Sequence, residues 1–355
     1  MTATVIKFGG SSFATPESFH RVAAYVHKRA QSGEDMVVVV SAPPNLTENW
    51  RGLLTEVNAA PSPRTLGGLL PRADTVSAYL IAAAFDAIQV SNRVIPADLL
   101  GIETDDVFQN ASPVSVDLQQ VEKTLKRGDI VIVPGGQAQS AEGDLTWLGK
   151  NSSDVSAILI AAYLGAKRCT ICSDVSGIYS GDPHAFSDAQ LIPRISYQDA
   201  ITMSVAGAKV LHHRAVAVAR DHCVELELRL NRPPFESGTI VGASGTARAV
   251  VPDDRSKVFV FPNAQSREAG RRAFDAHNLT LVDMSHETDA PLVVTCGFSD
   301  PEGILREADV PFSKTPQKIL TVLDRGQIKR TLCPSTAALS KTAMQSHTTV
   351  INLPG

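Results

Sequence analysis

The segment that first suggests chemistry is KFGGSS at residues 7–12, close to the amino terminus. Glycines let a backbone approach phosphate closely, their N–H groups can point at it, and a lysine adds a positive charge. The segment is neither a Walker A loop (GxxxxGK[ST]) nor a dinucleotide-binding GxGxxG turn. Taken alone, it is equally compatible with an ordinary tight turn in which Lys7 is an exposed lysine at the end of a strand.

Three later segments have the same mixture of glycine, hydroxyl and charged residues: LGKNSSDVSA at 148–157, SDVSGIYSGDP at 173–183 and GAKVLHHRAV at 207–216. Each also has an ordinary structural explanation when taken singly. Asp154 could be an acid that complements the dipole of a helix N-terminus, and Tyr179 could pack in the core. The order of the four segments is therefore more informative than any one of them.

In this order and spacing, the four segments resemble aspartate kinase, within the amino-acid kinase family, whose motifs read KFGG[ST]S, LGRGGSD, TDVDG-[IV]-Y-T-[AS]-DPR and GAKVLH. The resemblance covers about residues 4–242. It implies an α/β amino-acid kinase fold, with a mostly parallel sheet sandwiched by helices and a smaller ACT-like α+β domain at the C-terminal end. It also implies an ATP-dependent kinase that phosphorylates the side-chain carboxylate of aspartate or a close analogue to an acyl phosphate.

The resemblance assigns the phosphoryl-transfer machinery to matching positions. Lys7 and the backbone of Gly9 and Gly10 would hold the transferring γ-phosphoryl group. Lys209 would contact the ATP phosphates from the other side, and Asp154 would orient the lysines and help to organise Mg²⁺ with the phosphates. Lys7, Asp154 and Lys209 are thus the predicted catalytic residues, with ATP and Mg²⁺ as the expected cofactors and no dedicated cluster of metal ligands.

Nine other positions are matched to ligands. Ser173, Asp174, Tyr179 and Asp182 would border the nucleotide, together with Gly9, Gly10 and Lys209. The predicted contacts to the amino-acid substrate come from Ser11, Ser12, Asp74, Lys150 and Ser153.

This assignment fits the chemistry of phosphoryl transfer. The reaction needs positioning and positive charge on the equatorial oxygens, with little covalent chemistry from the protein. Two lysines, backbone donors and Mg²⁺ can supply that charge, so no nucleophilic serine or cysteine is required. A carboxylate is already ionised at neutral pH, so a strong general base is not required either.

The sequence departs from the family in the substrate pocket. Lys150 replaces an arginine that clamps a substrate carboxylate, and lysine offers a compact charge rather than a planar fork. Asp74 replaces a longer glutamate that holds the substrate amino group, and His184 replaces a permanent cation near the phosphates. These changes leave open a second hypothesis, a non-catalytic pseudokinase that binds nucleotide or amino acid. A Rossmann dehydrogenase is disfavoured because the glycine pattern is missing.

The predicted elements alternate between strand and helix over the first 240 residues, which indicates a mostly parallel sheet covered on both faces. Residues 45–72, rich in Pro, Gly and Asn, are predicted to form a loose insertion. The expected strands are 4–8, 36–40, 129–133, 168–172 and 224–228, and the expected helices begin or lie at 16, 74–87, 117–126, 152–164, 197–205 and 212–221.

The pattern changes after residue 245. A strand at 257–261, a helix at 267–277 and strands at 280–284 and 291–296 give a β-α-β-β order, the start of a split βαβ unit. We therefore expect a catalytic domain at 1–245 and an ACT-like regulatory or dimerisation domain at 246–355. The latter is expected to be truncated, with segments 318–324 and 348–353 as remnants of a second ACT unit, and to make the protein a homodimer.

The composition and net charge limit the classes of partner that the protein is expected to bind. A net charge of −4 gives no reason to expect nucleic-acid binding, and no apolar run approaches the ~20 residues that span a bilayer. Without a signal-peptide pattern, a cytoplasmic location is expected. Cys169 and Cys172 form a lone C-x-x-C in a predicted buried strand, so a structural role is favoured over a redox or zinc site.

Overall fold

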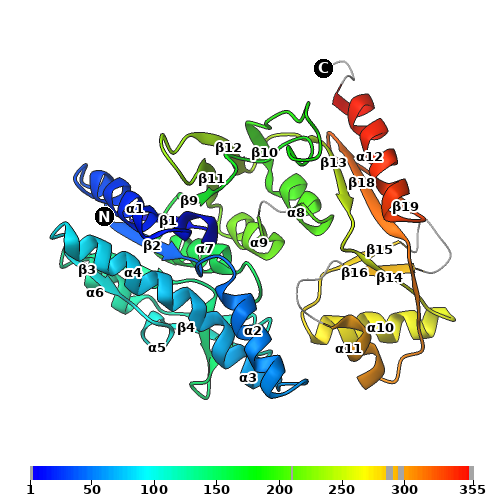
Figure 1. The fold of residues 1–355 in the computed structure, drawn as a ribbon, viewed down its shortest axis with the longest axis horizontal. Helices are drawn as coiled ribbons and strands as arrows, with labels where there is room; N and C mark the ends of the chain where they lie inside the picture. Colours follow the sequence, from blue (N-terminus) through cyan, green and yellow to red (C-terminus); the bar gives the residue numbers. More distant parts are fainter. Residues whose placement is uncertain (1–2, 209–210, 285–290, 295–299, 352–355) are drawn as a thin grey trace. The chain divides into compact units, whose positions relative to one another are not determined.

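The computed structural model describes residues 3–208, 211–284, 291–294 and 300–351 (Figure 1). The chain divides into two compact units. The first unit comprises Met1–Gly177 and Arg214–Ala243, and the second comprises Ile178–His213 and Ser244–Gly355.

A twisted, mostly parallel sheet forms the centre of the first unit, as the sequence predicts. Within this unit its strands run in the order β12-β11-β9-β1-β2-β6-β3, and β12 is antiparallel to β11 while the other pairs are parallel. The strand β12 was missed by the sequence prediction, which ended this half at β11. The strands are β1 (Thr4–Phe8), β2 (Met36–Val40), β3 (Asn92–Val94), β6 (Ile130–Pro134), β9 (Arg168–Ser173), β11 (Glu225–Leu230) and β12 (Ser237–Gly242).

Helices cover the sheet because alternate strand residues point to opposite faces. Ile6 and Phe8 of β1 pack in one core cluster with α1 (Pro16–Ala30) and α4 (Ala73–Ala87). Lys7 points to the other face, where α7 (Ser153–Tyr163) contacts β1, β2 and β9. The shorter α6 (Gln119–Leu125) packs on β6, and α9 (His213–Asp221) precedes β11.

The prediction of a loose insertion at 45–72 is wrong. The segment forms α2 (Leu46–Val57), α3 (Pro63–Leu69) and a 3₁₀ turn, η2 (Leu70–Arg72). Its Asn, Ser and Pro residues stand at helix ends: Asn45 has a left-handed φ of 65° just before α2, and the Ser62 hydroxyl accepts the Thr65 N–H at 3.1 Å just before α3. Residue types that are common in loops therefore mark the starts of helices in this segment.

Four strands form a separate small sheet in the order β5-β4-β7-β8. All four precede α7 in the sequence. The antiparallel hairpin of β7 and β8 precedes α7. The bounds are β4 (Ile102–Thr104), β5 (Pro113–Val116), β7 (Gln137–Ser140) and β8 (Leu145–Trp147), with α5 (Ala97–Leu100) before β4.

In the second unit, one sheet completes the predicted split βαβ pattern. Its chain order is β14-α10-β15-β16-α11-β17 and its spatial order is β15-β16-β14-β17, with antiparallel pairs throughout. The predicted β-α-β-β start is confirmed, and α11 and β17 extend it. The elements are β14 (Lys257–Val260), α10 (Ala264–Ala276), β15 (Leu281–Asp283), β16 (Pro291–Val294), α11 (Pro301–Glu307) and β17 (Ser313–Thr315).

The remaining elements of this unit form a second layer. The strands β13 (Arg248–Asp253), β18 (Lys318–Asp324) and β19 (Gln327–Cys333) make an antiparallel sheet that packs against α12 (Thr336–Ile351). The unit also includes β10 (Arg194–Ser196) and α8 (Tyr197–Val205), whose first turn is capped by the Ser196 hydroxyl. The assignment of 318–324 and 348–353 to a second ACT unit, and the domain boundary at 245, stay predictions; residues 352–353 lie outside the described residues.

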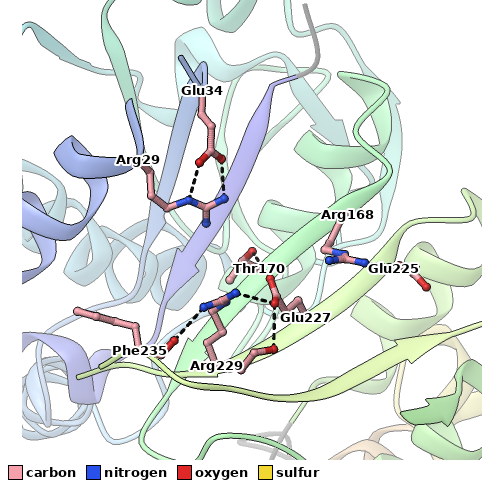
Figure 2. A network of polar contacts seen from close by, with 9 residues as sticks. Arg29, Glu34, Arg168, Thr170, Glu225, Glu227, Arg229 and Phe235 are labelled. Atoms are coloured by element: carbon pink, nitrogen blue, oxygen red, sulfur yellow. Dashed lines mark hydrogen bonds and ion pairs between the residues drawn. The ribbon is translucent and has the colours of Figure 1, made fainter. Parts of the chain in front are cut away.

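A polar network fastens the β11–β12 turn in the first unit (Figure 2). The guanidinium of Arg229 donates to Glu227 Oε1 at 2.8 Å and to the Phe235 carbonyl at 2.9 Å, and Ser237 donates to the same carboxylate at 2.9 Å. Glu227 is nearly buried, and the neighbouring Arg229 charge and the hydroxyl bond outweigh desolvation and hold its pKa below the usual value. Both strands are thereby held at the end where the chain turns.

Candidate active site

The central feature is a buried ion pair at the C-terminal end of β1. Lys7 Nζ lies 2.7 Å from Asp154 Oδ1, and the two side chains are only 10% and 6% exposed. Strand alternation places Lys7 on the α7 face, and Asp154 stands in the first turn of α7, where the helix dipole favours a negative charge. Lys7 is thus not an exposed strand-end lysine.

The loop after β1 is a short 3₁₀ turn, η1 (Gly10–Phe13), packed tightly against its neighbours. The Gly9 N–H donates to the Cys172 carbonyl at 3.0 Å, which ties the loop to the end of β9. A Cβ at Gly10 would lie 2.6 Å from the Ala42 carbonyl oxygen, so only glycine fits at that place. The role predicted for Gly9 would require its N–H to leave Cys172, whereas the first N–H groups of η1 have no partner inside the turn.

Asp74 stands in the first turn of α4 and its Oδ1 accepts the Ala42 N–H. Desolvation raises the pKa of this carboxyl to about 8, against the opposing effects of the Ala42 N–H and the charge of Lys7. In the protein without ligands, Asp74 is therefore mostly protonated at pH 7. A substrate ammonium group would favour the ionised form.

Lys150 lies between β8 and α7, and Ser153 is the first residue of α7. Lys150 Nζ is 2.9 Å from Glu48 Oε1 on α2, in an ion pair with both side chains substantially exposed. Ser153 is buried, its hydroxyl lies 2.7 Å from Ser41 Oγ after β2, and a Cβ at Gly135 would meet Ser153 Cβ at 2.4 Å. The close approach of Gly135 fixes the start of α7 against the end of β6.

The predicted nucleotide residues divide between the two units. Ser173 ends β9 in the first unit and Asp174 follows it, and the Ser173 hydroxyl donates to Asp174 Oδ1 at 3.1 Å. Tyr179 and Asp182 belong to the second unit. Lys209 lies outside the described residues, so its predicted role has no structural counterpart here.

In the second unit, the segment that carries Tyr179 and Asp182 is a closed loop. Ser180 exchanges backbone and side-chain bonds with Gln190, at 2.8 and 2.9 Å, and its carbonyl accepts the Val250 N–H at 2.8 Å. The Ser180 hydroxyl also lies 2.9 Å from Nε2 of His347, which is 1% exposed on α12. His347 is thus a buried core histidine, with its Nδ1 3.3 Å from Asp188 Oδ1, and His184 is exposed.

The structure brings most predicted residues of the first unit to one edge of the sheet. Lys7, the loop after β1, Asp154 and Ser173 all lie at the C-terminal ends of β1 and β9 or at the N-terminus of α7, where open α/β sheets bind their ligands. Asp74 is within electrostatic reach of Lys7. Predicted separately from distant motifs, these groups form one polar cluster.

Sequence reasoning missed three residues of this cluster. Glu48 pairs with Lys150, and Asn231 donates to the Ser11 and Ser12 hydroxyls at 2.8 and 3.1 Å. Arg214 bonds the carbonyls of Ala111 and Leu148 at 2.7 and 3.2 Å, and so holds the start of the 148–157 segment. Only Arg214 carried a signal, because it stands inside the 207–216 motif.

Other candidate chemistry is not supported by the structure. Burial raises the pKa of the Cys169 thiol, and it raises that of Cys172 to about 12, so neither thiol of the C-x-x-C is activated. Over the described ranges, no group of three or more His, Cys, Asp or Glu side chains is arranged to hold a metal ion. None of the helices in the described part of the chain is long and apolar enough to cross a bilayer.

Comparisons with known proteins agree with this geometry. The model of the amino acid kinase family matches residues 2–228. The aspartokinase of Bacillus sp. (strain MGA3) is 34% identical over 273 residues, which cover 74% of this chain and 66% of that protein. The aspartokinase of Mycobacterium tuberculosis is 34% identical over 244 residues, covering 68% of this chain and 58% of the relative. The chain thus spans less than two thirds of the length of these relatives.

Solved structures show the same fold. Escherichia coli aspartokinase III in complex with aspartate and ADP has a TM-score of 0.73 at 20% identity, covering 90% of this chain and 87% of that one. The same enzyme with lysine and aspartate has a TM-score of 0.67 at 19% identity over 99% and 100% of the two chains. Aspartate kinase from Synechocystis has a TM-score of 0.61 at 25% identity, covering 90% of this chain and 59% of its own.

Proposed function

The chain belongs to the amino acid kinase family, and from this premise we propose that it transfers the γ-phosphoryl group of ATP to the side-chain carboxylate of aspartate or a close analogue. The observation that carries the proposal is the buried Lys7–Asp154 pair beside a glycine loop at the C-terminal edge of the sheet. The aspartokinase relatives, one of them solved with aspartate and ADP, support the same reaction.

In the proposed reaction, a carboxylate oxygen of the substrate attacks the γ-phosphorus. The bond from that phosphorus to the β,γ-bridging oxygen breaks, ADP leaves with the electron pair, and an acyl phosphate is formed. Lys7 supplies positive charge to the transferring group, and Asp154 holds the lysine in place through the 2.7 Å contact. Because the pair is nearly buried, its charges are screened weakly by solvent and already positioned.

Mg²⁺ fits this site only as a companion of ATP. The described residues offer no three-ligand cage, and Asp154 forms an ion pair with Lys7. A cation of this kind keeps several waters and binds through one or two carboxylates and the substrate phosphates. Its contribution when bound is to neutralise charge on the phosphate oxygens, and the substrate is oriented by the protein itself.

The amino-acid end of the pocket is assigned to Asp74, Lys150, Ser153 and the serines of the first loop. Asp74, once ionised, would pair with the substrate ammonium group. Lys150 would release Glu48 and bind a substrate carboxylate instead. Breaking the Lys150–Glu48 ion pair costs little free energy, because an exposed ion pair contributes only about 0–1 kcal/mol. The nucleotide would be bordered by Ser173 and Asp174, with Tyr179, Asp182 and Lys209 completing its site.

The test is ATP-dependent hydroxamate formation with purified protein, Mg²⁺ and hydroxylamine, over a panel of acidic amino acids led by L-aspartate. Hydroxylamine traps acyl phosphates, so the product reports the chemistry itself. Lys7→Met is expected to lower the rate by about 100-fold or more, by analogy with the loss of one transition-state donor. Lys126→Met is the matched control, because that lysine is exposed and lies 3.9 Å from Glu122 one turn away.

Three outcomes separate the hypotheses. A signal with aspartate supports an aspartate kinase, and a signal with another acid alone supports a retuned kinase. Silence across the panel together with measurable ATP binding would instead support the pseudokinase alternative. Equal rates for Lys7→Met and wild type would show that the phosphoryl clamp is placed wrongly.

The organisation of the whole chain is part of the proposal. Residues 1–245 would form the catalytic domain, and residues 246–355 an ACT-like regulatory or dimerisation domain that joins two copies. The complete split βαβ unit built from β14–β17 supports this assignment. Light scattering on the full chain should give twice the mass of 37.8 kDa, and a monomer at micromolar concentration would contradict it.

A further inference from the structure

Asn231 connects the loop after β1 with the end of β9. Its side-chain Nδ2 lies 2.8 Å from Ser11 Oγ and 3.1 Å from Ser12 Oγ, and its backbone N–H donates to the Ser173 carbonyl at 2.7 Å. The residue follows β11, whose end lies beside that of β9 in the sheet. It therefore touches the predicted substrate serines without belonging to any of the four motifs.

The direction of the two hydrogen bonds from Asn231 decides whether the serine hydroxyls can donate their own protons to a ligand. An amide nitrogen carries two hydrogens and accepts none, so both serine hydroxyls act as acceptors toward Asn231. A hydroxyl that accepts in this way keeps its own proton to donate elsewhere. Carboxylate and phosphoryl oxygens only accept hydrogen bonds, so Ser11 and Ser12 are left in the state that such an anion requires.

The turn that carries Asn231 is held firmly. Leu230 N–H donates to the Glu236 carbonyl at 2.9 Å, and Phe235 N–H to the Arg232 carbonyl at 2.7 Å. Arg229 adds the bond to the Phe235 carbonyl shown in Figure 2, and the Phe235 ring stacks on Tyr25 with centroids 3.9 Å apart. The position of Asn231 is thus fixed on folding, and little ordering remains to be done when a ligand binds.

We infer that Asn231 is a positioning residue for the anionic substrate: it holds the Ser11 and Ser12 hydroxyls as hydrogen-bond donors toward the substrate carboxylate or the transferring phosphoryl group. This inference rests on the proposed function, because it deepens the role of the loop after β1. The reacting atoms do not touch Asn231 itself, which acts through the two serines.

Asn231→Asp tests this direction of bonding with almost no change in shape. At neutral pH it replaces the amide donor with a carboxylate, so the serine protons turn toward residue 231 and a like charge faces the anionic substrate. We expect kcat in the hydroxamate assay to fall by about 10- to 100-fold, with thermal stability little changed. Asn231→Ala, which removes the donor without adding charge, should lose less activity than Asn231→Asp.

A pH series separates positioning from a merely structural role. As pH falls from 6 to 4, toward the ordinary pKa of about 4 for an aspartate, protonation of the introduced carboxyl restores an O–H donor, so the activity of Asn231→Asp relative to wild type should rise. Asn263→Asp is the matched control: it adds the same charge at the N-cap of α10, where aspartate caps as well as asparagine does. Its activity should equal that of wild type at each pH.

Several results would overturn the inference. A rate for Asn231→Asp equal to wild type would do so, as would a pH-independent loss accompanied by a lower melting temperature. If the wild-type protein forms no hydroxamate, the proposed catalytic function fails, and titration calorimetry with L-aspartate and with inorganic phosphate then decides. Weaker binding by Asn231→Asp would keep the inference, whereas equal affinity, or a wild-type protein that binds neither anion, would overturn it.

Discussion

The most quantitative prediction concerns Asp74, whose burial raises its pKa to about 8. If the ionised carboxyl holds the substrate ammonium group, binding at neutral pH must first remove a proton. With a pKa of about 8, roughly one molecule in eleven is ionised at pH 7 and about three quarters at pH 8.5. The apparent KM for the amino acid should therefore fall by about eightfold over this interval, since affinity scales with the binding-competent fraction.

Asp74→Asn is the matched perturbation, because it keeps the shape and cannot ionise. Its KM should be raised at pH 8.5 and should lack the eightfold change that wild type shows. The titration of the substrate's own amino group affects both proteins equally, so the difference between their profiles isolates Asp74. Steady-state hydroxamate kinetics from pH 6.5 to 8.5 provide the measurement, and parallel profiles for the two proteins would refute the assignment.

The same shift predicts how stability depends on pH. A carboxyl whose pKa is raised on folding binds a proton that the unfolded chain releases, so stability falls as pH rises from about 4 to about 8. The slope for one proton is at most about 1.4 kcal/mol per pH unit. Urea titrations should show this decline in wild type relative to Asp74→Asn, and an increase in relative stability over the same range would contradict the burial of the carboxyl.

Three further predictions follow from the same site. Lys7→Met and Asp154→Asn should each lower the free energy of unfolding by about 3–5 kcal/mol, because each variant leaves the other charge of a buried ion pair without its partner. Urea titration measures the losses. Fully additive losses in the double variant would show that the two side chains do not interact. Glu48→Gln should lower the KM for an acidic amino acid by about two- to fivefold by releasing Lys150, and an unchanged KM at low salt would argue against the exchange. Cys172, whose thiol pKa is raised to about 12, should resist iodoacetamide at pH 8 until urea unfolds the protein, as peptide mass spectrometry can show.

The sequence predicted the central elements well because their signals are local. Runs such as 36–40 are apolar throughout, as expected for strands buried on both faces, and Pro16 after Thr15 marks the start of α1. The insertion at 45–72 failed for an equally local reason. Its Asn, Ser and Pro residues stand at helix ends, where the Ser62 hydroxyl caps α3, and composition alone does not distinguish a helix end from a loop.

The polar contacts of the candidate site were harder to predict because they join distant parts of the chain. Lys150 and Glu48 are 102 residues apart in sequence, and Asn231 and Ser11 are 220 apart. No periodicity or motif specifies such a pair until the fold brings the strand ends together. The resemblance could name Lys150 as a substrate contact, but only the structure shows that Lys150 pairs with Glu48.

The residues predicted to border the nucleotide show the limit of motif reading most clearly. The motif at 173–183 is continuous in sequence, yet the chain passes from the first unit to the second between Gly177 and Ile178. Beyond that point Ser180 is fastened by Val250 of β13 and by the buried His347 of α12. One sequence motif thus contributes residues to two units, and in the second unit the C-terminal elements hold the residue next to Tyr179.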